Sequence, residues 1–263
     1  MIITIHDDFD LYKITYSGQV FRAKQLDDTT YSFVTGNNRL IISYLGDDKY
    51  DVSCDMNTWN NIWHDYFDLD TCYRDIRSLI PADDQYLSEC ADIGTGIRIL
   101  KQDKFEMLIS FIISQRKSIP AIKSSVEKLC NLYGTNSLFP TPAQLKDAST
   151  GELASCGLGY RTEYVYEAVQ RVYHNEINLD VIDKYDDEAL LETLKTFKGV
   201  GDKVANCVLL FAYHRTGCAP IDTWIKKVID TRYNGVNPFP QYGKYAGVMQ
   251  QYIFYAAQHT HTL

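Results

Sequence analysis

The chain has 263 residues, of which 45% are hydrophobic, so it is long and apolar enough to bury the core of one large or two ordinary domains. Its 26 basic and 34 acidic residues give a formal net charge of -8, which as a whole-chain value argues against a polyanionic partner. The N-terminus has no basic stretch followed by an apolar run, and the apolar run 208–212 is too short for a membrane span. We therefore expect a folded protein that is neither secreted through a signal peptide nor inserted in a membrane.

The cysteines indicate the compartment. Seven of them are scattered along the chain and none forms a C-x-x-C pair, so neither a disulfide framework nor a zinc site is expected. A reducing, cytoplasmic location is the expectation, associated with the nucleoid if the source is prokaryotic.

The first 55 residues predict an antiparallel sheet. Short runs with alternating apolar and polar residues are separated by glycine, asparagine and aspartate turns. The predicted strands are Leu11–Tyr16, Gln19–Leu26, Thr30–Thr35, Arg39–Leu45 and Lys49–Cys54. This part of the chain is expected to form a meander.

Helical spacing replaces this pattern from about residue 57, and from residue 103 most of the chain predicts helices joined by short loops. The expected helices are Phe105–Ser114, Ser118–Tyr133, Glu163–His174, one capped by Asp186 that runs to Phe197, and Asp202–Tyr213. We predict an α+β protein, with an antiparallel β/α domain over residues 1–90 and an α-helical domain of two lobes, with a cleft between them, over residues 91–263.

Charge divides at the same point. Residues 1–90 hold 16 acidic and 7 basic side chains, net -9, whereas residues 91–263 hold 18 acidic and 19 basic ones, net +1. Within residues 195–232 there are seven basic and three acidic residues, net +4. The net negative charge therefore comes from the N-terminal part. The local basic patch is compatible with a nucleic-acid partner.

The basic patch surrounds a glycine turn between two predicted helices, Gly199-Val200-Gly201. Two glycines allow a tight turn, and the N–H groups at the start of the following helix can bind a phosphate. Taken alone, the Gly-x-Gly pattern is better explained by an ordinary helical hairpin with a glycine cap.

Lys203 lies in the first turn of the second helix, where the helix dipole disfavours a cation. This placement favours the neutral amine that a nucleophilic lysine requires. Nineteen residues later, Asp222 follows a Gly/Pro-containing loop at a predicted helix N-cap. Taken singly, Lys203 is explained as a surface lysine and Asp222 as a capping residue.

Together, the hairpin, the lysine and the loop that ends in aspartate resemble the helix-hairpin-helix DNA glycosylase superfamily. A lysine at this place resembles the bifunctional glycosylase/lyase members, whereas members without it only hydrolyse. Four further segments resemble the 8-oxoguanine DNA glycosylase family, from about residue 11 to 257. They are Ser17-Gly-Gln-Val-Phe-Arg22, Tyr66-Phe-Asp-Leu-Asp70, Gly157-Leu-Gly-Tyr-Arg161 and the helix Gly243–Phe254.

The resemblance implies a pocket for the lesion base. Gly18 would offer its carbonyl to the N7–H that oxidised guanine has and guanine lacks, and a site built on that hydrogen bond discriminates sharply. Cys207 and Phe254 would sandwich the flipped base, and Gln250 would bind its Watson–Crick edge. Without the motifs, Cys207 and Phe254 are explained as core residues.

The loop that fills the space left by the flipped base carries Arg116 and Lys117 where the family has asparagines. One arginine that reads the opposite cytosine is Ala121 here, the other is kept as Arg161, and a histidine after the catalytic aspartate is replaced by Trp224. The residues implied to contact DNA are Gly199, Val200, Gly201, Arg116, Lys117, Tyr160, Arg161 and Trp224. Weak reading of the opposite base is expected.

The implied reaction excises 8-oxoguanine from damaged double-stranded DNA, with Lys203 as the nucleophile and Asp222 stabilising charge on the sugar. No catalytic metal or organic cofactor is expected, although a monovalent cation would fit on the hairpin carbonyls near Gly199 and Gly201. A monomer that does not bind membranes is expected. Two alternatives stay open: an alkylpurine or broad-specificity glycosylase, and a non-catalytic helix-hairpin-helix DNA-binding module.

Overall fold

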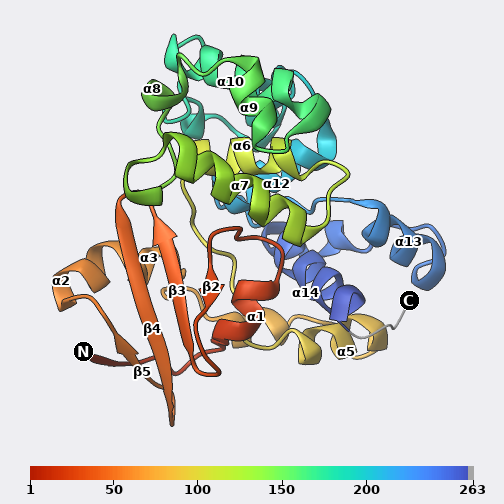
Figure 1. Ribbon diagram of the computed structural model, residues 1–263. Coiled ribbons are helices and arrows are strands. Elements are labelled where there is room, and N and C mark those ends of the chain that lie inside the picture. The colour runs from red at the N-terminus through yellow and green to blue at the C-terminus, as the bar shows by residue number, and fades with distance from the viewer. Residues whose placement is uncertain (260–263) are drawn as a thin grey trace. The chain divides into compact units, whose positions relative to one another are not determined.

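The computed structural model describes residues 1–259, and the chain forms two compact units (Figure 1). Unit 1 contains residues 1–33, 39–101 and the described residues from His214 to His259; unit 2 contains residues 34–38 and 102–213. The predicted domain boundary near residue 90 falls inside unit 1, and that division into domains stays a prediction. No helix in the described residues is both long enough and apolar enough to cross a membrane.

A five-stranded antiparallel sheet with the order β1-β5-β4-β3-β2 forms the N-terminal part of the described chain. In β4–β5 pairing Tyr44 is opposite Tyr50, and the register shifts between Tyr44 and Gly46. The strands are β1 (Ile2–Thr4), β2 (Lys24–Gln25), β3 (Thr30–Thr35), β4 (Asn38–Gly46) and β5 (Lys49–Val52). The expected α+β class is confirmed, as are the strands predicted at 30–35, 39–45 and 49–54.

The predicted strand at 11–16 is wrong, because this segment is the helix α1 (Leu11–Tyr16). Asp10 caps it by accepting a hydrogen bond from the Lys13 N–H at 2.9 Å. The buried residues Leu11, Ile14 and Thr15 are spaced to share one helical face, a pattern that the apparent alternation concealed. The strand predicted at 19–26 shortens to β2, and β1 was not predicted.

The remaining helical segments of unit 1 follow the sheet or lie after unit 2 in the chain. They are α2 (Met56–Thr58), η1 (Trp59–Trp63), α3 (His64–Tyr66), α4 (Tyr73–Arg77), α5 (Gln85–Ile93), α13 (Thr223–Arg232), η5 (Phe239–Tyr245) and α14 (Ala246–His259). Helices α5 and α14 pack on each other so closely that a Cβ atom at Gly94 would lie 2.7 Å from the Tyr252 ring. Unit 1 is thus built from both ends of the chain.

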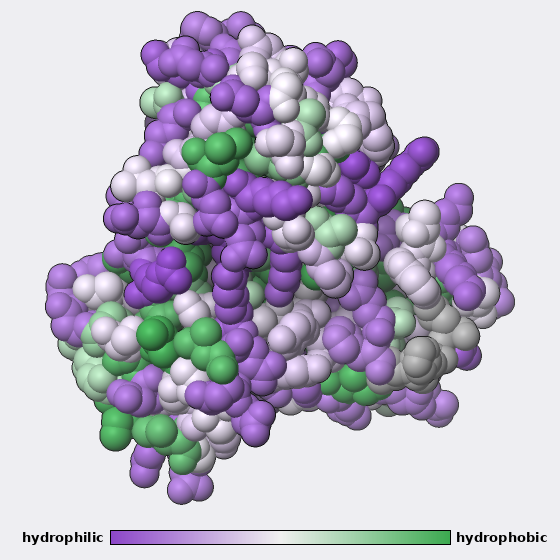
Figure 2. Space-filling view, viewed as in Figure 1, coloured by the Kyte–Doolittle hydropathy of each residue, from purple (hydrophilic) through white to green (hydrophobic). Residues whose placement is uncertain are grey.

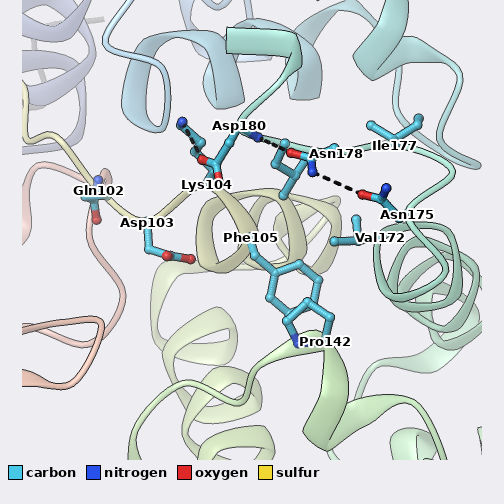
Figure 3. Close-up of a pocket in the computed structure, with 11 residues that line it drawn as sticks. Gln102, Asp103, Lys104, Phe105, Pro142, Val172, Asn175, Ile177, Asn178 and Asp180 are labelled. Carbon is cyan, nitrogen blue, oxygen red and sulfur yellow. Dashed lines mark hydrogen bonds and ion pairs between the residues drawn. The ribbon is translucent and has the colours of Figure 1, made fainter.

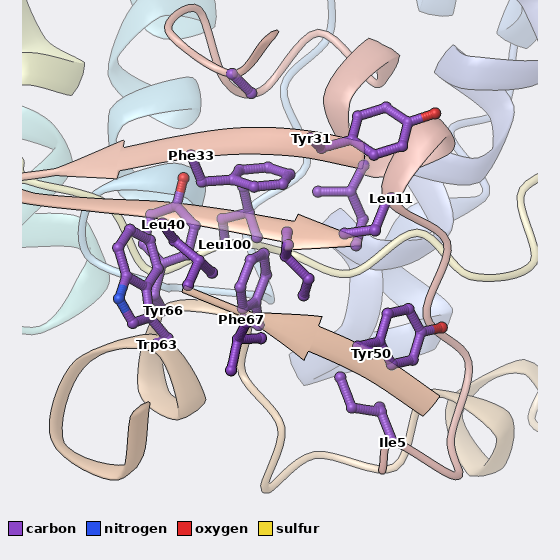
Figure 4. Packing of buried hydrophobic residues seen from close by; sticks show 14 of the residues in the cluster. Ile5, Leu11, Tyr31, Phe33, Leu40, Tyr50, Trp63, Tyr66, Phe67 and Leu100 are labelled. Carbon is purple, nitrogen blue, oxygen red and sulfur yellow. The ribbon is translucent and has the colours of Figure 1, made fainter. Parts of the chain in front are cut away.

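Aromatic side chains fill the core beneath the sheet (Figure 4). Phe67 is fully buried, and its ring meets those of Phe9 and Phe33 edge-on, with centroids 5.1 Å apart in each pair. Trp63 and Leu40 are also fully buried in this cluster. On the face shown in Figure 2, most of the surface is hydrophilic and hydrophobic surface gathers over the strands.

A buried carboxylate, Asp68, contacts Lys101, where the chain leaves unit 1, and His214, where the chain returns to it. It is 2% exposed and accepts a hydrogen bond from the Tyr73 hydroxyl at 3.0 Å. Lys101 Nζ lies 3.2 Å from Oδ1 and His214 Nε2 lies 3.4 Å from Oδ2. Burial by itself would raise the pKa of Asp68, but the hydrogen bond from His214 and the charges of His214 and Lys101 hold that pKa below its ordinary value.

Asp68 is therefore expected to contribute stability above the ordinary aspartate pKa of about 4, and that contribution is lost as the pH falls further and the carboxylate is protonated. Asp68→Asn should lower the free energy of urea unfolding at pH 7 by about 1–3 kcal/mol. The difference from the unmodified protein should shrink below about pH 4. Asp70→Asn is the control, since the Asp70 side chain is 82% exposed. A difference that is the same at pH 7 and pH 3 would contradict this role.

Unit 2 is helical apart from its loops and residues 34–38, which are the end of β3, a two-residue turn and the first residue of β4. Its segments are α6 (Lys104–Ser114), α7 (Ile119–Tyr133), η2 (Thr135–Ser137), α8 (Pro142–Leu145), α9 (Thr150–Ser155), η3 (Gly159–Arg161), α10 (Thr162–Tyr173), η4 (Ile182–Lys184), α11 (Asp187–Lys195) and α12 (Asp202–Phe211). The five helices predicted between residues 103 and 213 are confirmed, with ends that differ by at most two residues, whereas the last helix, expected at 243–254, is α14 and spans 246–259. Asp186 caps α11 as predicted, accepting from the Ala189 N–H at 2.8 Å.

Candidate active site

The glycine hairpin connects α11 to α12 in unit 2. The Val200 N–H donates to the Phe197 carbonyl at 3.0 Å, which closes the turn. Gly199 has a φ of +79°, and a Cβ atom there would lie 2.3 Å from Cδ2 of Tyr164. The turn therefore needs glycine at 199 for both its backbone conformation and its contact with α10.

Gly199→Ala is expected to destabilise the protein by about 1–3 kcal/mol, because alanine at a positive φ is strained and its methyl group overlaps the Tyr164 ring. Urea unfolding measures the loss. Gly201→Ala is the matched control, since Gly201 has a φ of -101° and its Cβ would meet no atom within 4 Å. Equal losses for the two variants would show that the contact with Tyr164 has no effect.

Two backbone N–H groups of the hairpin remain available for an anion. The Val200 N–H is used inside the turn, whereas those of Gly199 and Gly201 have no partner among residues 1–259. They directly precede α12, whose N-terminus adds partial positive charge. This arrangement favours a phosphate at the start of α12.

Lys203 lies half-buried in the first turn of α12. Its Nζ atom is 5.7 Å from the centroid of the Phe111 ring, which stacks on Phe211 with a centroid separation of 5.5 Å. It forms no ion pair with a described residue of unit 2. Cys207 follows one turn later and is 4% exposed. The amine is therefore presented against an aromatic surface, away from any carboxylate of its own unit.

Asp222 belongs to unit 1 and caps α13. Its Oδ1 atom accepts from the Ile225 N–H at 2.8 Å, which confirms the predicted cap. Its Oδ2 atom has no hydrogen-bond partner among the described residues, and the side chain is half-buried. One oxygen thus orders the helix while the other stays available. Trp224, two residues on, is 45% exposed in the first turn of α13.

The other residues expected to contact the lesion base, apart from Cys207, also belong to unit 1. Gly18 follows α1 with a φ of +79°, and Gln250 and Phe254 lie one turn apart on α14. Gln250 is 3% exposed, and its buried Oε1 atom has no partner in residues 1–259. Such an orphaned acceptor is costly unless a ligand satisfies it. Phe254 is half-buried among fully buried neighbours.

Two loops of unit 2 carry the other predicted DNA contacts. Arg161 is 6% exposed, and its guanidinium donates to the Leu158 carbonyl at 3.1 Å and to the Gln115 carbonyl from Nε at 2.7 Å. It also lies 4.3 Å from the centroid of the Tyr160 ring, which is 50% exposed. Arg161 therefore holds the loop at 115 in place, a role that the sequence did not reveal.

Lys117 joins the same two loops. Its Nζ donates to Ser125 Oγ at 2.5 Å and to the Gly157 carbonyl at 2.7 Å. Burial, with the neighbouring charges of Arg161 and Lys128, lowers the pKa of Lys117. Arg116 lies before it, exposed and with a φ of +50°. Arg116 is therefore exposed, whereas the charged groups of Lys117 and Arg161 are engaged in hydrogen bonds within unit 2.

A cavity of about 400 Å³ lies elsewhere in unit 2, and none of the predicted site residues lines it (Figure 3). Phe105 and Pro142 form one side, and Lys104 pairs with Asp180 at 2.8 Å at its edge. No group of three or more histidine, cysteine, aspartate or glutamate side chains within residues 1–259 is arranged to hold a metal ion. None of the seven cysteines, all of which are described, forms a disulfide.

Two protein-family models match the chain. The model of the HhH-GPD superfamily of base excision DNA repair proteins matches residues 109–251, which is more than half of the chain. The model of the 8-oxoguanine DNA glycosylase N-terminal domain matches residues 1–108. The hairpin, Lys203 and Asp222 all lie within the first match. The fold and the hairpin therefore define a helix-hairpin-helix protein of base excision repair.

Individual relatives agree. A probable N-glycosylase/DNA lyase of Methanothermobacter thermautotrophicus is 30% identical over 225 residues, which are 72% of this chain and 71% of the relative. A structure of MBOgg1 in complex with a low-affinity DNA ligand has a TM-score of 0.92 at 32% identity, covering 99% of this chain and 96% of the other. A structure of the Clostridium acetobutylicum 8-oxoguanine glycosylase/lyase, in complex with double-stranded DNA containing cytosine opposite 8-oxoG, has a TM-score of 0.89 at 31% identity. The match covers 99% of this chain and 98% of the other. The chain belongs to the 8-oxoguanine DNA glycosylase family.

Proposed function

We propose that this protein is a bifunctional DNA glycosylase and AP lyase that removes 8-oxoguanine from duplex DNA. Its family and the N-glycosylase/DNA lyase relatives support this function. The observation that carries it is Lys203 in the first turn of the helix after the glycine hairpin, presented to an aromatic ring and without a carboxylate partner in its own unit. A lysine in this place is the group that a combined glycosylase and lyase reaction needs.

In the proposed reaction, the Lys203 amine attacks the anomeric carbon of the flipped nucleotide and the bond to the base breaks. The base leaves with the electron pair of that bond and takes up a proton. The sugar ring then opens to give a Schiff base on the lysine, and β-elimination breaks the bond to the 3′ phosphate. Asp222, through its unbound Oδ2, stabilises the positive charge that develops on the sugar.

Base recognition is proposed to use the four residues that the family resemblance implies. The Gly18 carbonyl accepts the N7–H of 8-oxoguanine, and the orphaned Gln250 Oε1 accepts from the Watson–Crick edge. Cys207 and Phe254 pack on the two faces of the base. A normal guanine presents a lone pair at N7, which the Gly18 carbonyl repels.

The grip on DNA is proposed to come from the N–H groups of the hairpin and from the exposed side chains Arg116, Tyr160 and Trp224. We propose damaged duplex DNA as the partner, a monomer as the acting form and the cytoplasm as the location. The hairpin carbonyls near Gly199 and Gly201 would accept a monovalent cation.

Borohydride trapping on an 8-oxoguanine duplex tests the function. A covalent complex together with strand cleavage is expected. Binding without any trapping or base release would favour the non-catalytic DNA-binding module. Faster release of 3-methyladenine or hypoxanthine than of 8-oxoguanine, in matched duplexes, would favour the alkylpurine or broad-specificity glycosylase.

Only weak preference among the four bases opposite the lesion is expected. One predicted cytosine reader is Ala121, and the guanidinium of the other, Arg161, is engaged with the Gln115 and Leu158 carbonyls of its own unit. Single-turnover excision from duplexes with each opposite base measures the preference. Excision opposite cytosine that is more than about 100-fold faster than opposite the other bases, on the order of 3 kcal/mol, would contradict this expectation.

A further inference from the structure

A buried glutamine that the sequence did not identify as part of the site connects the two elements that read the lesion base in unit 1. Gln251 is 2% exposed on α14, and its Nε2 atom donates to the Ser17 carbonyl at 2.5 Å. We infer that Gln251 is a positioning residue that sets the direction of the Gly18 carbonyl. This inference rests on the proposed excision of 8-oxoguanine.

The first step of the argument is the geometry of one peptide group. The Ser17 carbonyl and the Gly18 N–H belong to the same planar peptide unit, so a hydrogen bond that fixes the carbonyl also fixes the plane that enters Gly18. Gly18 itself has a φ of +79°, where the backbone has no side chain to restrain it. The hydrogen bond from Gln251 supplies that restraint from a helix 234 residues away in the chain.

Gln19, the residue after Gly18, is held in place by hydrogen bonds as Ser17 is. Gln19 is fully buried, and its Nε2 atom donates to Ser17 Oγ and to the Arg98 carbonyl, both at 2.8 Å. Its Oε1 atom accepts from the Leu100 N–H at 2.8 Å. Gly18 therefore lies between two anchored neighbours, and only Gln251 among these anchors belongs to α14.

Gln251 is next to Gln250 on that helix. Because successive helical residues are turned by about 100°, the two side chains leave α14 in different directions. Gln251 is engaged with the turn, whereas the Oε1 atom of Gln250 has no partner. Helix α14 thus carries Gln250 and also holds the turn that contains Gly18. The distance between the two acceptors, Gln250 Oε1 and the Gly18 carbonyl oxygen, is therefore fixed.

Removing the Gln251 donor should make the distance between Gln250 Oε1 and the Gly18 carbonyl variable, while Lys203 is unchanged. Gln251→Leu leaves the buried Ser17 carbonyl unsatisfied, and the peptide is expected to turn toward another donor. We expect excision of 8-oxoguanine to slow by roughly 10- to 100-fold, the effect of losing one buried hydrogen bond. Cleavage at a preformed abasic site has no base to read, and its rate should change by no more than about twofold.

The experiment compares single-turnover rates on a duplex with 8-oxoguanine opposite cytosine and on the same duplex with an abasic site. Gln251→Leu and Gln251→Glu are measured beside Gln258→Leu, which places the same change at an exposed position of α14. Gln251→Glu keeps the shape but replaces the donor by an oxygen, so it decides the question if the leucine variant does not fold. Both Gln251 variants should lose excision selectively, while Gln258→Leu keeps both rates.

An equal loss of the two activities would overturn the inference, because it would show that Gln251 only stabilises the fold. Unchanged excision in Gln251→Glu would overturn it too. An unmodified protein that cleaves the abasic site but does not excise 8-oxoguanine would overturn the proposed substrate, and the inference with it. The abasic-site rate also reports that each variant is folded.

Discussion

Replacing Lys203 by glutamine is expected to abolish both the borohydride-trapped complex and strand cleavage, with a rate loss of at least about 1000-fold. Glutamine keeps a polar side chain of similar reach, but its amide nitrogen is not a nucleophile and cannot form a Schiff base. Because Lys203 makes no ion pair with a described residue of its own unit, its loss leaves no buried charge without a partner. Binding to an 8-oxoguanine duplex should persist, as measured by fluorescence anisotropy.

Lys198→Gln is the matched control for this experiment. Lys198 lies in the same hairpin and is exposed, with Nζ 5.9 Å from the centroid of the Tyr164 ring. Its replacement removes one positive charge from the same basic patch and should leave trapping intact. Trapping that survives in Lys203→Gln, or that disappears in Lys198→Gln, would show that Lys203 is not the nucleophile.

Asp222→Asn is expected to slow base excision by about 100- to 1000-fold without a measurable loss of stability. Asparagine caps a helix as well as aspartate does, so the hydrogen bond to the Ile225 N–H and with it α13 should be retained. What this substitution removes is the negative charge that we propose stabilises the sugar in the transition state. Thermal unfolding and single-turnover excision, measured on the same preparation, separate the two roles.

Asp186→Asn provides the comparison, because Asp186 caps α11 through the same kind of hydrogen bond and has no proposed part in the reaction. Both asparagine variants should unfold at the temperature of the unmodified protein, and only Asp222→Asn should lose activity. Full activity in Asp222→Asn would show that Asp222 is a capping residue and nothing more.

The parts of the structure that depend on near neighbours in the chain were predictable. A cap at Asp222, a cap at Asp186 and a tight turn at Gly199 each follow from residues within one helical turn, and each is confirmed. The structure of the segment 11–16 could not be predicted in this way, because its six residues fit both a helical and an alternating pattern. Its cap at Asp10 was the signal that would have decided between them.

The parts of the site that depend on distant contacts could not be predicted. Nothing in the sequence around Gln251 indicates a hydrogen bond to Ser17, and nothing around Arg161 indicates that its guanidinium binds the Gln115 carbonyl. The resemblance to a family supplied the candidates Gly18 and Gln250, but the supporting residues come only from the folded chain. A positioning residue is hard to predict since it needs no motif of its own.

The close packing of α5 on α14 has a consequence for how the protein is made. Unit 2 is nearly continuous in the chain, whereas α5 packs against a helix that is translated only after all of unit 2. At ordinary rates of synthesis the delay between the two helices is on the order of 10 s. During that time the α5 face around Gly94 lacks the Tyr252 ring that later covers it, so nascent chains should be most prone to aggregation and most dependent on chaperones in this interval.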